Sequence, residues 1–106
     1  MSVQTPGYVY IWEYTVWPEH VADFEKAYGP HGAWVTLFKR AGGYLQTELH
    51  RNRNVPNRYV TIDYWESLEV WHSFRTAFSA EFDAIDAQCE YFTREEREIG
   101  RFTPLD

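Results

Sequence analysis

The chain has 106 residues, of which 44% are hydrophobic and 25% are charged, and its formal net charge is −6. This length and composition predict a single globular domain over residues 1–106, with a core at about 8–103, and leave no room for a second domain. The acidic balance gives a polyanion no electrostatic attraction, so we expect no nucleic-acid partner. The apolar runs are too short for a membrane span, so we expect no membrane association.

Targeting signals and cysteine usage bear on the compartment. The stretch MSVQTPGYVY has neither a basic region nor a long apolar run, so we expect no secretory signal. Cys89 is the single cysteine and therefore has no partner for an intrachain disulfide. A lone cysteine is typical of a reducing compartment, and the sequence predicts a cytoplasmic protein.

The first half of the chain predicts one strand and two helices. YVYIWEYTV (8–16) is rich in β-branched and aromatic residues and predicts a strand. Pro18 begins a helix that carries apolar residues at helical spacing and ends at 29–30, Gly-Pro. A second apolar stripe runs from Trp34 to Ala41, and the glycines at 42–43 end that helix.

The second half repeats this order, with its own strands and helices. Residues 44–51 and 58–65 predict two strands joined as a hairpin through the polar loop NRNVPN. Ser67 is a predicted N-cap for a helix whose apolar stripe extends to Phe78, and Ser79 is a predicted cap for a helix ending near Cys89. Residues 96–102 predict the last strand.

The resulting order is β-αα-β-β-αα-β, with two similar halves. FEKAY (24–28) and FRTAF (74–78) lie in equivalent helices and support the repeat. Interleaving two such units gives an α+β, ferredoxin-like fold: a four-stranded antiparallel sheet with helices on one face. The other face of the sheet is then bare and partly apolar, so we expect a second copy of the chain to cover it as a homodimer.

Ionisable side chains on the predicted strands are the candidates for chemistry. In the expected strand order, four of them converge on one face: Glu13, Glu48, His50 and Asp63. Carboxylates held close together raise at least one pKa, which makes a general acid or base that works near neutral pH. The alternative is that these groups lie in water at strand ends or pair with Arg51 or Arg58. The sequence leaves both interpretations open.

Aromatic residues make up 19% of the chain, with five Trp and eight Tyr among them. A small domain buries a modest fraction of its surface, so we expect some of these rings to line a pocket or a subunit interface. Trp71 fits either the core or a pocket wall, and Trp65 closes the third strand where the chain enters a helix.

A metal site is not expected, because the chain lacks HxH, HExxH and CxxC spacings. Cys89 fits a small buried hydrophobe.

The element order, DYWES (63–67) and AGGYLQTEL (41–49) resemble the antibiotic biosynthesis monooxygenase-like domains of the dimeric α+β barrel superfamily. The resemblance covers about residues 8–103. It implies a homodimer whose bare sheet faces join into a barrel, with a small pocket between sheet and helices in each subunit. In the quinol oxygenases of this superfamily a Trp near the end of the third strand lines the pocket, which implies that role for Trp65.

The same superfamily includes haem-degrading enzymes, so this chain can be compared with the residues that bind haem in them. Those enzymes have an Asn on the first strand, where this chain has Trp12 and Glu13, and a His on the helix after Trp71. Residues 79–91 contain no His. The histidine that would be the axial ligand of the haem iron is missing, so we expect no haem. The resemblance to the cofactor-independent quinol oxygenases implies no other cofactor.

Two functions remain open from the sequence. In the first, a small phenol or quinol held among Trp12, Trp65 and Trp71, with Glu48 in the wall, loses a proton to a nearby base. The candidate bases are the carboxylates and imidazole named above: Asp63, His50 and Glu13. The resulting anion reacts with dioxygen without a cofactor, as in a monooxygenase. In the second, the domain is not an enzyme and binds a small ligand or only dimerises.

Overall fold

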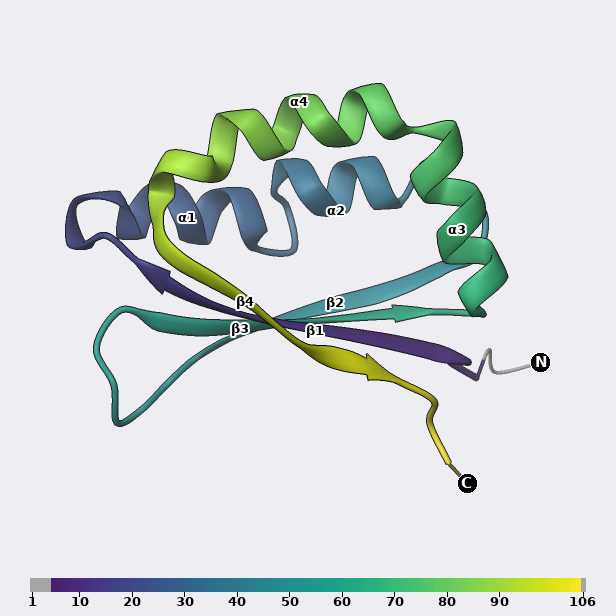
Figure 1. Ribbon diagram of the computed structural model, residues 1–106, viewed down its shortest axis with the longest axis horizontal. Coiled ribbons are helices and arrows are strands. Elements are labelled where there is room, and N and C mark those ends of the chain that lie inside the picture. Colours follow the sequence, from purple (N-terminus) through teal and green to yellow (C-terminus); the bar gives the residue numbers. More distant parts are fainter. Residues whose placement is uncertain (1–4, 106) are drawn as a thin grey trace.

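The computed structural model describes residues 5–105 and shows a sheet covered on one side by helices (Figure 1). In chain order these residues form β1 (Tyr8–Val16), the 3-10 turn η1 (Pro18–His20), α1 (Val21–Tyr28), α2 (Ala33–Phe38), β2 (Tyr44–Arg51), β3 (Arg58–Trp65), α3 (Leu68–Ala77), α4 (Ser79–Cys89), the 3-10 turn η2 (Glu90–Phe92) and β4 (Thr93–Phe102). No helix within this part of the chain is long and apolar enough to cross a membrane.

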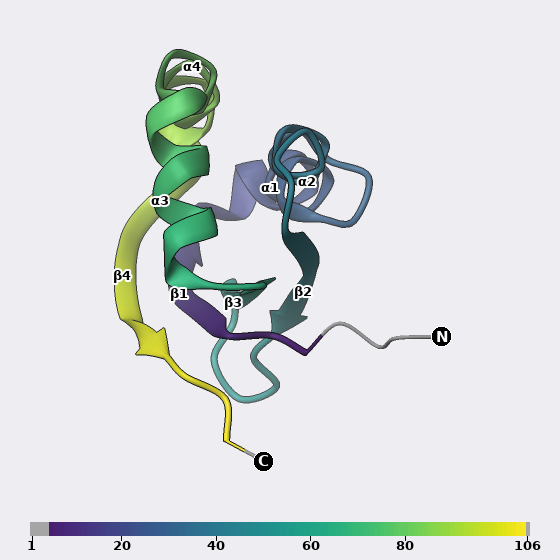
Figure 2. The ribbon, with the colours of Figure 1, turned by 90° about the vertical axis from the view of Figure 1, so that its right-hand side faces the viewer.

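The sheet has the order β2-β3-β1-β4, and neighbouring strands are antiparallel. This confirms the expected ferredoxin-like arrangement, in which the first strand neighbours the third and the third neighbours the second. Viewed along the strands, the pair α1–α2 lies above the β2 side of the sheet and the pair α3–α4 above the β4 side (Figure 2). The opposite face carries no helix from residues 5–105.

Element boundaries differ from the expectation at three places. The helix expected from Pro18 opens as the turn η1, so regular α-helix begins at Val21. The second helix ends at Phe38, short of the predicted Ala41, because the next amides bond three residues back in tighter turns. The last strand begins at Thr93, three residues before the predicted start, since β1 continues to pair with it.

The helix caps give one confirmation and one correction. Ser67 caps α3 as predicted: its Oγ accepts the backbone N–H of Val70 at 3.1 Å. Ser79 was the expected cap of α4, and the structure gives it no capping hydrogen bond. The reason is that α3 runs almost directly into α4, with the Phe82 N–H bonded to the Phe78 carbonyl at 2.8 Å, so helical backbone partners replace the cap.

Aromatic rings form most of the core between the sheet and the helices. Trp65, Phe24 and Phe74 are fully buried, and the Trp65 ring centroid lies 5.1 Å from that of Phe74. On β1 the aromatic residues recur at every second position, so a single face of that strand carries them toward the helices. The aromatic excess of the sequence therefore goes into this layer.

One glycine fixes the entry into the sheet. Gly43, just before β2, has a φ of 92°, in the region that favours glycine. A Cβ there would also lie 2.5 Å from a Val70 methyl carbon. The Gly43 carbonyl accepts the Glu66 N–H at 2.9 Å, which ties the start of β2 to the end of β3. The glycine thus lets α3 pack closely against the corner after Trp65.

Candidate active site

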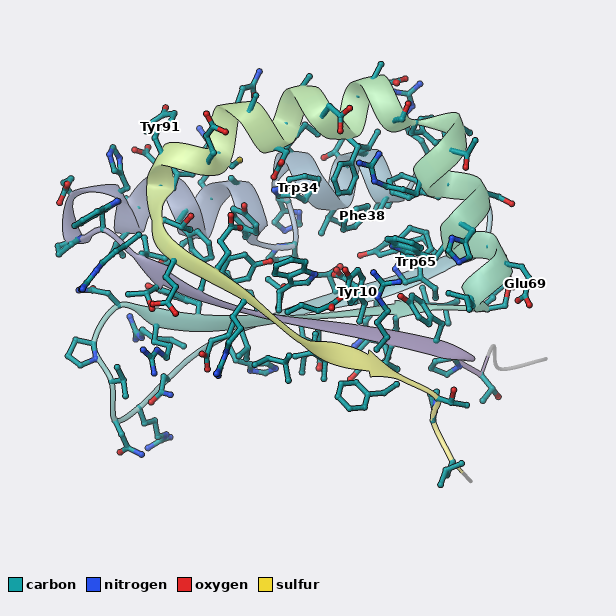
Figure 3. All side chains as sticks on the ribbon, viewed as in Figure 1. Tyr10, Trp34, Phe38, Trp65, Glu69 and Tyr91 are labelled. Atoms are coloured by element: carbon teal, nitrogen blue, oxygen red, sulfur yellow. The ribbon has the colours of Figure 1, made fainter. Side chains whose placement is uncertain are left out.

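A cavity of about 420 Å³ lies between the helix-covered face of the sheet and the helices. This volume is within the range of small-molecule sites. Its lining combines rings with a few charged groups: Tyr10, Trp12, Tyr14, Tyr28, Trp34, Phe38, Thr47, Thr61, Asp63, Trp71, Arg75, Phe82, Asp86, Glu96 and Arg101. Figure 3 shows three of these, Tyr10, Trp34 and Phe38, in the layer between sheet and helices.

The floor of the cavity comes from strand alternation and its roof from helical rings. Tyr10, Trp12 and Tyr14 are alternate residues of β1 and therefore share the helix-covered face. From the helices, the Trp71 ring meets Tyr10 edge-on with centroids 5.5 Å apart. Trp34 meets Phe82 in the same way at 4.9 Å. A flat aromatic ligand would therefore find rings on both sides.

Asp63 is the acidic group at the centre of the sheet wall. It pairs with Tyr10 across β1–β3 and with Thr47 across β2–β3, so all three share the cavity face. The Thr47 hydroxyl donates to its carboxylate at 2.7 Å, and the Tyr44 hydroxyl donates to Thr47 at 2.8 Å. Asp63 is half-buried, and the side that remains accessible lies on the cavity.

The surroundings of Asp63 change its protonation. Burial raises the pKa of this carboxyl from 3.8 to about 7, because the charged form loses hydration, and the Thr47 hydrogen bond opposes the rise. The group therefore exchanges protons near neutral pH. Such a carboxyl accepts a proton in its ionised form and returns it readily, as a general acid–base catalyst must.

The raised pKa of Asp63 predicts a stability effect. Between about pH 4 and 7 the folded state retains a proton that the unfolded chain has released, so the free energy of unfolding falls as pH rises, by up to about 4 kcal/mol. Asp63→Asn removes this dependence, and the variant gains stability relative to the parent as pH rises from 4.5 to 8. Urea unfolding at both pH values measures the difference, with exposed Asp23→Asn as control. A difference that is constant across this range would contradict the assignment.

The two ends of the cavity carry different charges. Near Tyr10, Arg101 lies on the adjacent strand β4. Near Tyr14, Glu96 pairs across β1–β4, and burial together with Asp86 raises the pKa of the Glu96 carboxyl. Tyr14 itself is hydrogen-bonded to Thr61 at 2.9 Å, and burial keeps the pKa of its phenol well above the usual value.

The predicted convergence of four ionisable side chains on one face is wrong. Asp63 lies on the helix-covered face, whereas Glu13, Glu48 and His50 lie on the open face. The reason is the register: Glu13 and His50 both pair with Val60, and Glu48 with Ile62, so their parity along the strands is opposite to that of Asp63.

The three open-face residues have partners there. Glu13 accepts a hydrogen bond from Arg97 at 2.9 Å. Glu48 accepts one from the Tyr64 hydroxyl at 3.1 Å and lies 3.6 Å from the His50 imidazole. None of the three lines the cavity. These contacts correspond to the alternative in which the charges pair in or near water, although the partners differ from the expected Arg51 and Arg58.

Of the predicted pocket residues, Trp12 and Trp71 line the cavity. Trp65 and Glu48 do not. Trp65 is fully buried one layer behind the wall, against Phe38 and Tyr44 at centroid distances of 5.5 and 5.3 Å. β3 ends at Trp65, and α3 begins at Leu68 and packs over this corner, so the ring fills the corner and does not line the cavity.

Sequence reasoning missed several cavity residues, and strand parity is the signal that could have found some of them. Tyr10 and Tyr14 share the parity of Trp12 on β1. Thr47 follows once the β2–β3 register is known. Arg101 could not be assigned, because an irregularity in the β1–β4 pairing between Ile11 and Trp12 changes the parity of β4.

Comparisons with known proteins place this fold. It is similar to a candidate antibiotic biosynthesis monooxygenase from Bordetella bronchiseptica, with 24% identity, a TM-score of 0.72 and coverage of 95% of this chain and 99% of the other. It is also similar to SnoaB, a cofactor-independent oxygenase from Streptomyces nogalater, with 20% identity, a TM-score of 0.64 and 96% coverage of each chain. A candidate antibiotic biosynthesis monooxygenase from Nitrosomonas europaea gives 14% identity, a TM-score of 0.71 and coverage of 99% and 96%.

At these identities the solved structures establish the fold alone. A search of curated proteins finds no match. The sequence profile named antibiotic biosynthesis monooxygenase matches residues 7–87, which is most of the chain and spans β1 through most of α4. The chain therefore belongs to the antibiotic biosynthesis monooxygenase family.

Proposed function

We propose that this protein is a monooxygenase that oxidises a small phenol or quinol with dioxygen and without a cofactor. The observation that carries the proposal is Asp63, a carboxyl with a pKa of about 7 that faces an aromatic cavity. Family membership supports the reaction class. The similarity to SnoaB, a cofactor-independent oxygenase, supports the absence of a cofactor.

The first step is removal of the substrate hydroxyl proton. A flat phenol in the cavity beside Tyr10 and Trp71 can place its hydroxyl toward the sheet wall, where the ionised carboxylate of Asp63 accepts the proton. Thr47 holds one carboxylate oxygen at 2.7 Å, which leaves the other oxygen for the substrate. The rings that line the cavity reduce the contact of the phenolate with water.

The later steps need no external reductant, because the substrate supplies the electrons. The phenolate gives one electron to dioxygen, and the phenoxyl radical and superoxide combine into a C–O bond at a ring carbon. The peroxide takes up the proton held by Asp63. Loss of the ring proton and cleavage of the O–O bond then release water and leave a quinone. Phenol and dioxygen thus become quinone and water, with dioxygen as the oxidant.

Oxygen uptake with simple bicyclic phenols tests the proposal. With 1-naphthol and 1,5-dihydroxynaphthalene as probes, we expect consumption of one dioxygen per quinone formed, above the rate without protein. An equimolar amount of heat-denatured protein controls for autoxidation. Binding of these two phenols without any oxygen uptake would overturn the proposal and favour a non-catalytic binding domain.

The same proposal includes a homodimer formed through the open face of the sheet. That face presents Ile11 and Ile62 in adjacent strands, and Phe102 is 46% exposed at its edge. A partly apolar sheet face with no covering layer is typical of an association surface. Native mass spectrometry is expected to give twice 12.7 kDa. A monomer at micromolar concentration would overturn this part of the proposal without affecting the cavity.

A further inference from the structure

Three cavity residues lie in one row across the sheet. Tyr10 on β1 pairs with Asp63 on β3 and with Arg101 on β4, so the three side chains stand at one level on the same face. All three line the cavity. Neighbouring strands are about 4.8 Å apart, which puts the backbones of Asp63 and Arg101 roughly 10 Å from each other. The base and the cation therefore flank a tyrosine ring.

Arg101 is held against the cavity rings. Its guanidinium carbon lies 4.8 Å from the Tyr10 ring centroid and 5.3 Å from that of Trp71. Its Nε donates to Glu98 at 2.9 Å, and its Nη2 donates to the Tyr10 hydroxyl at 3.3 Å. Within residues 5–105 these contacts use two of the five guanidinium N–H groups. The Tyr8 hydroxyl also interacts with the guanidinium, and the donors that remain are left for a ligand.

Two other charged groups of the cavity lie at another level of the sheet or are already paired. Glu96 stands at the level of Tyr14, four residues along β1 from Tyr10, or roughly 13 Å. Arg75 is stacked on Phe82 at 3.9 Å and bonded to Asp83 at 3.2 Å. A negative group beside Arg101 would thus meet a guanidinium with donors left over, and it would compete with the Glu98 carboxylate, which is already bonded to Arg101.

We infer that Arg101 is a specificity-determining residue, and that the substrate is a phenol carrying a carboxylate on the part of the ring system far from the reacting hydroxyl. The inference rests on the proposed function for the role of the hydroxyl. With the hydroxyl at Asp63, a two-ring phenol that extends along this row past Tyr10 brings its far end to Arg101. The planar guanidinium matches a carboxylate in geometry and charge, and stacking on two rings holds it ready.

Calorimetric titration with two matched probes tests the inference. The probes are 6-hydroxy-2-naphthoate and its methyl ester, which share shape and hydroxyl and differ in charge. For the parent protein we expect tighter binding of the acid. Arg101→Gln is expected to weaken acid binding about tenfold or more and to change ester binding less than about threefold. Arg53→Gln, in the exposed β2–β3 loop, is the control for loss of a positive charge and is expected to change neither.

Two further variants separate recognition from support of the fold. Arg101→Lys keeps the positive charge but lacks the planar guanidinium, and we expect its affinity for the acid to lie between those of the parent protein and Arg101→Gln. Glu98→Gln removes the competing carboxylate, and we expect the acid to bind several-fold more tightly. A purely structural Arg101–Glu98 pair predicts the opposite sign, with weaker binding of both probes. Equal binding of acid and ester by the parent protein, equal losses in Arg101→Gln, or no binding of either probe would overturn the inference.

The outcome is separable from that of the proposed function. Binding of the acid that depends on Arg101, without oxygen uptake, supports the inference and removes the oxygenase. Oxygen uptake with 1-naphthol by the parent protein, together with equal binding of acid and ester, supports the oxygenase and removes the inference.

Discussion

Asp63→Asn lowers kcat/KM for oxygen uptake by about 10²–10⁴-fold, the usual contribution of a positioned general base. Asparagine keeps the shape of the side chain and still accepts the Thr47 hydrogen bond, so the cavity is expected to stay intact. What it loses is the ability to take the substrate proton. Oxygen electrode measurements with 1-naphthol give the rate, and calorimetry with the same ligand checks that binding is retained.

The pH dependence gives the same assignment a second readout. Asp63 acts as a base only when ionised, so kcat/KM in the parent protein rises with pH through about 7 and then levels. In Asp63→Asn the residual activity has no step there. A rise through 7 that persists in the variant would assign the titration to another group.

His50 and Glu13 supply the matched controls, because the sequence made them candidates for the same role. Both lie on the open face, and His50 lies 3.6 Å from Glu48 there. His50→Asn and Glu13→Gln are therefore expected to leave kcat/KM within about twofold of the parent. A loss of kcat/KM in either variant comparable to that in Asp63→Asn would contradict the assignment of the base to Asp63 and would place it on the open face of the sheet.

The fold could be predicted from the sequence because each element has a local signal. Alternation on β1, the glycine breaks and the Ser67 cap are all short-range features, and the order of elements then restricts the topology. The strand neighbours followed correctly. Boundaries shifted where backbone contacts with another element decided them, as at Thr93, where pairing with β1 extends the last strand.

The site was harder to predict, because it depends on register, and register is a long-range property. A shift of one residue moves every side chain to the other face. Asp63 was identified by residue type, but the residues around it were not. Its neighbours are Thr47 and Tyr10, with Arg101 one strand beyond Tyr10, and each position is fixed by a pairing between strands. Aromatic content indicated a pocket without showing which rings pack behind it.

Trp65 is the clearest example of a ring behind the wall, and its replacement is expected to have the largest effect on stability. Trp65→Ala removes a fully buried indole from among Phe38, Tyr44 and Phe74, and we expect a loss of about 3–5 kcal/mol. That is a large part of the 5–15 kcal/mol by which a domain of this kind is stable. Urea unfolding measures the loss, and Trp17→Ala, at a ring that is 41% exposed, is the control, with an expected change below about 1 kcal/mol.

A milder substitution distinguishes packing from a role in ligand binding. The Trp65 indole N–H is buried and has no hydrogen-bond partner among the described residues, so Trp65→Phe gives up no hydrogen bond and keeps an aromatic ring in the corner. We expect it to cost about 1–2 kcal/mol and to leave the Kd for 1-naphthol within about twofold. Trp71→Leu, in the cavity wall, is expected to weaken that ligand about tenfold at a smaller cost in stability, because Trp71 is only partly buried. If Trp65→Phe weakened the ligand as much as Trp71→Leu does, Trp65 would have to be returned to the cavity wall.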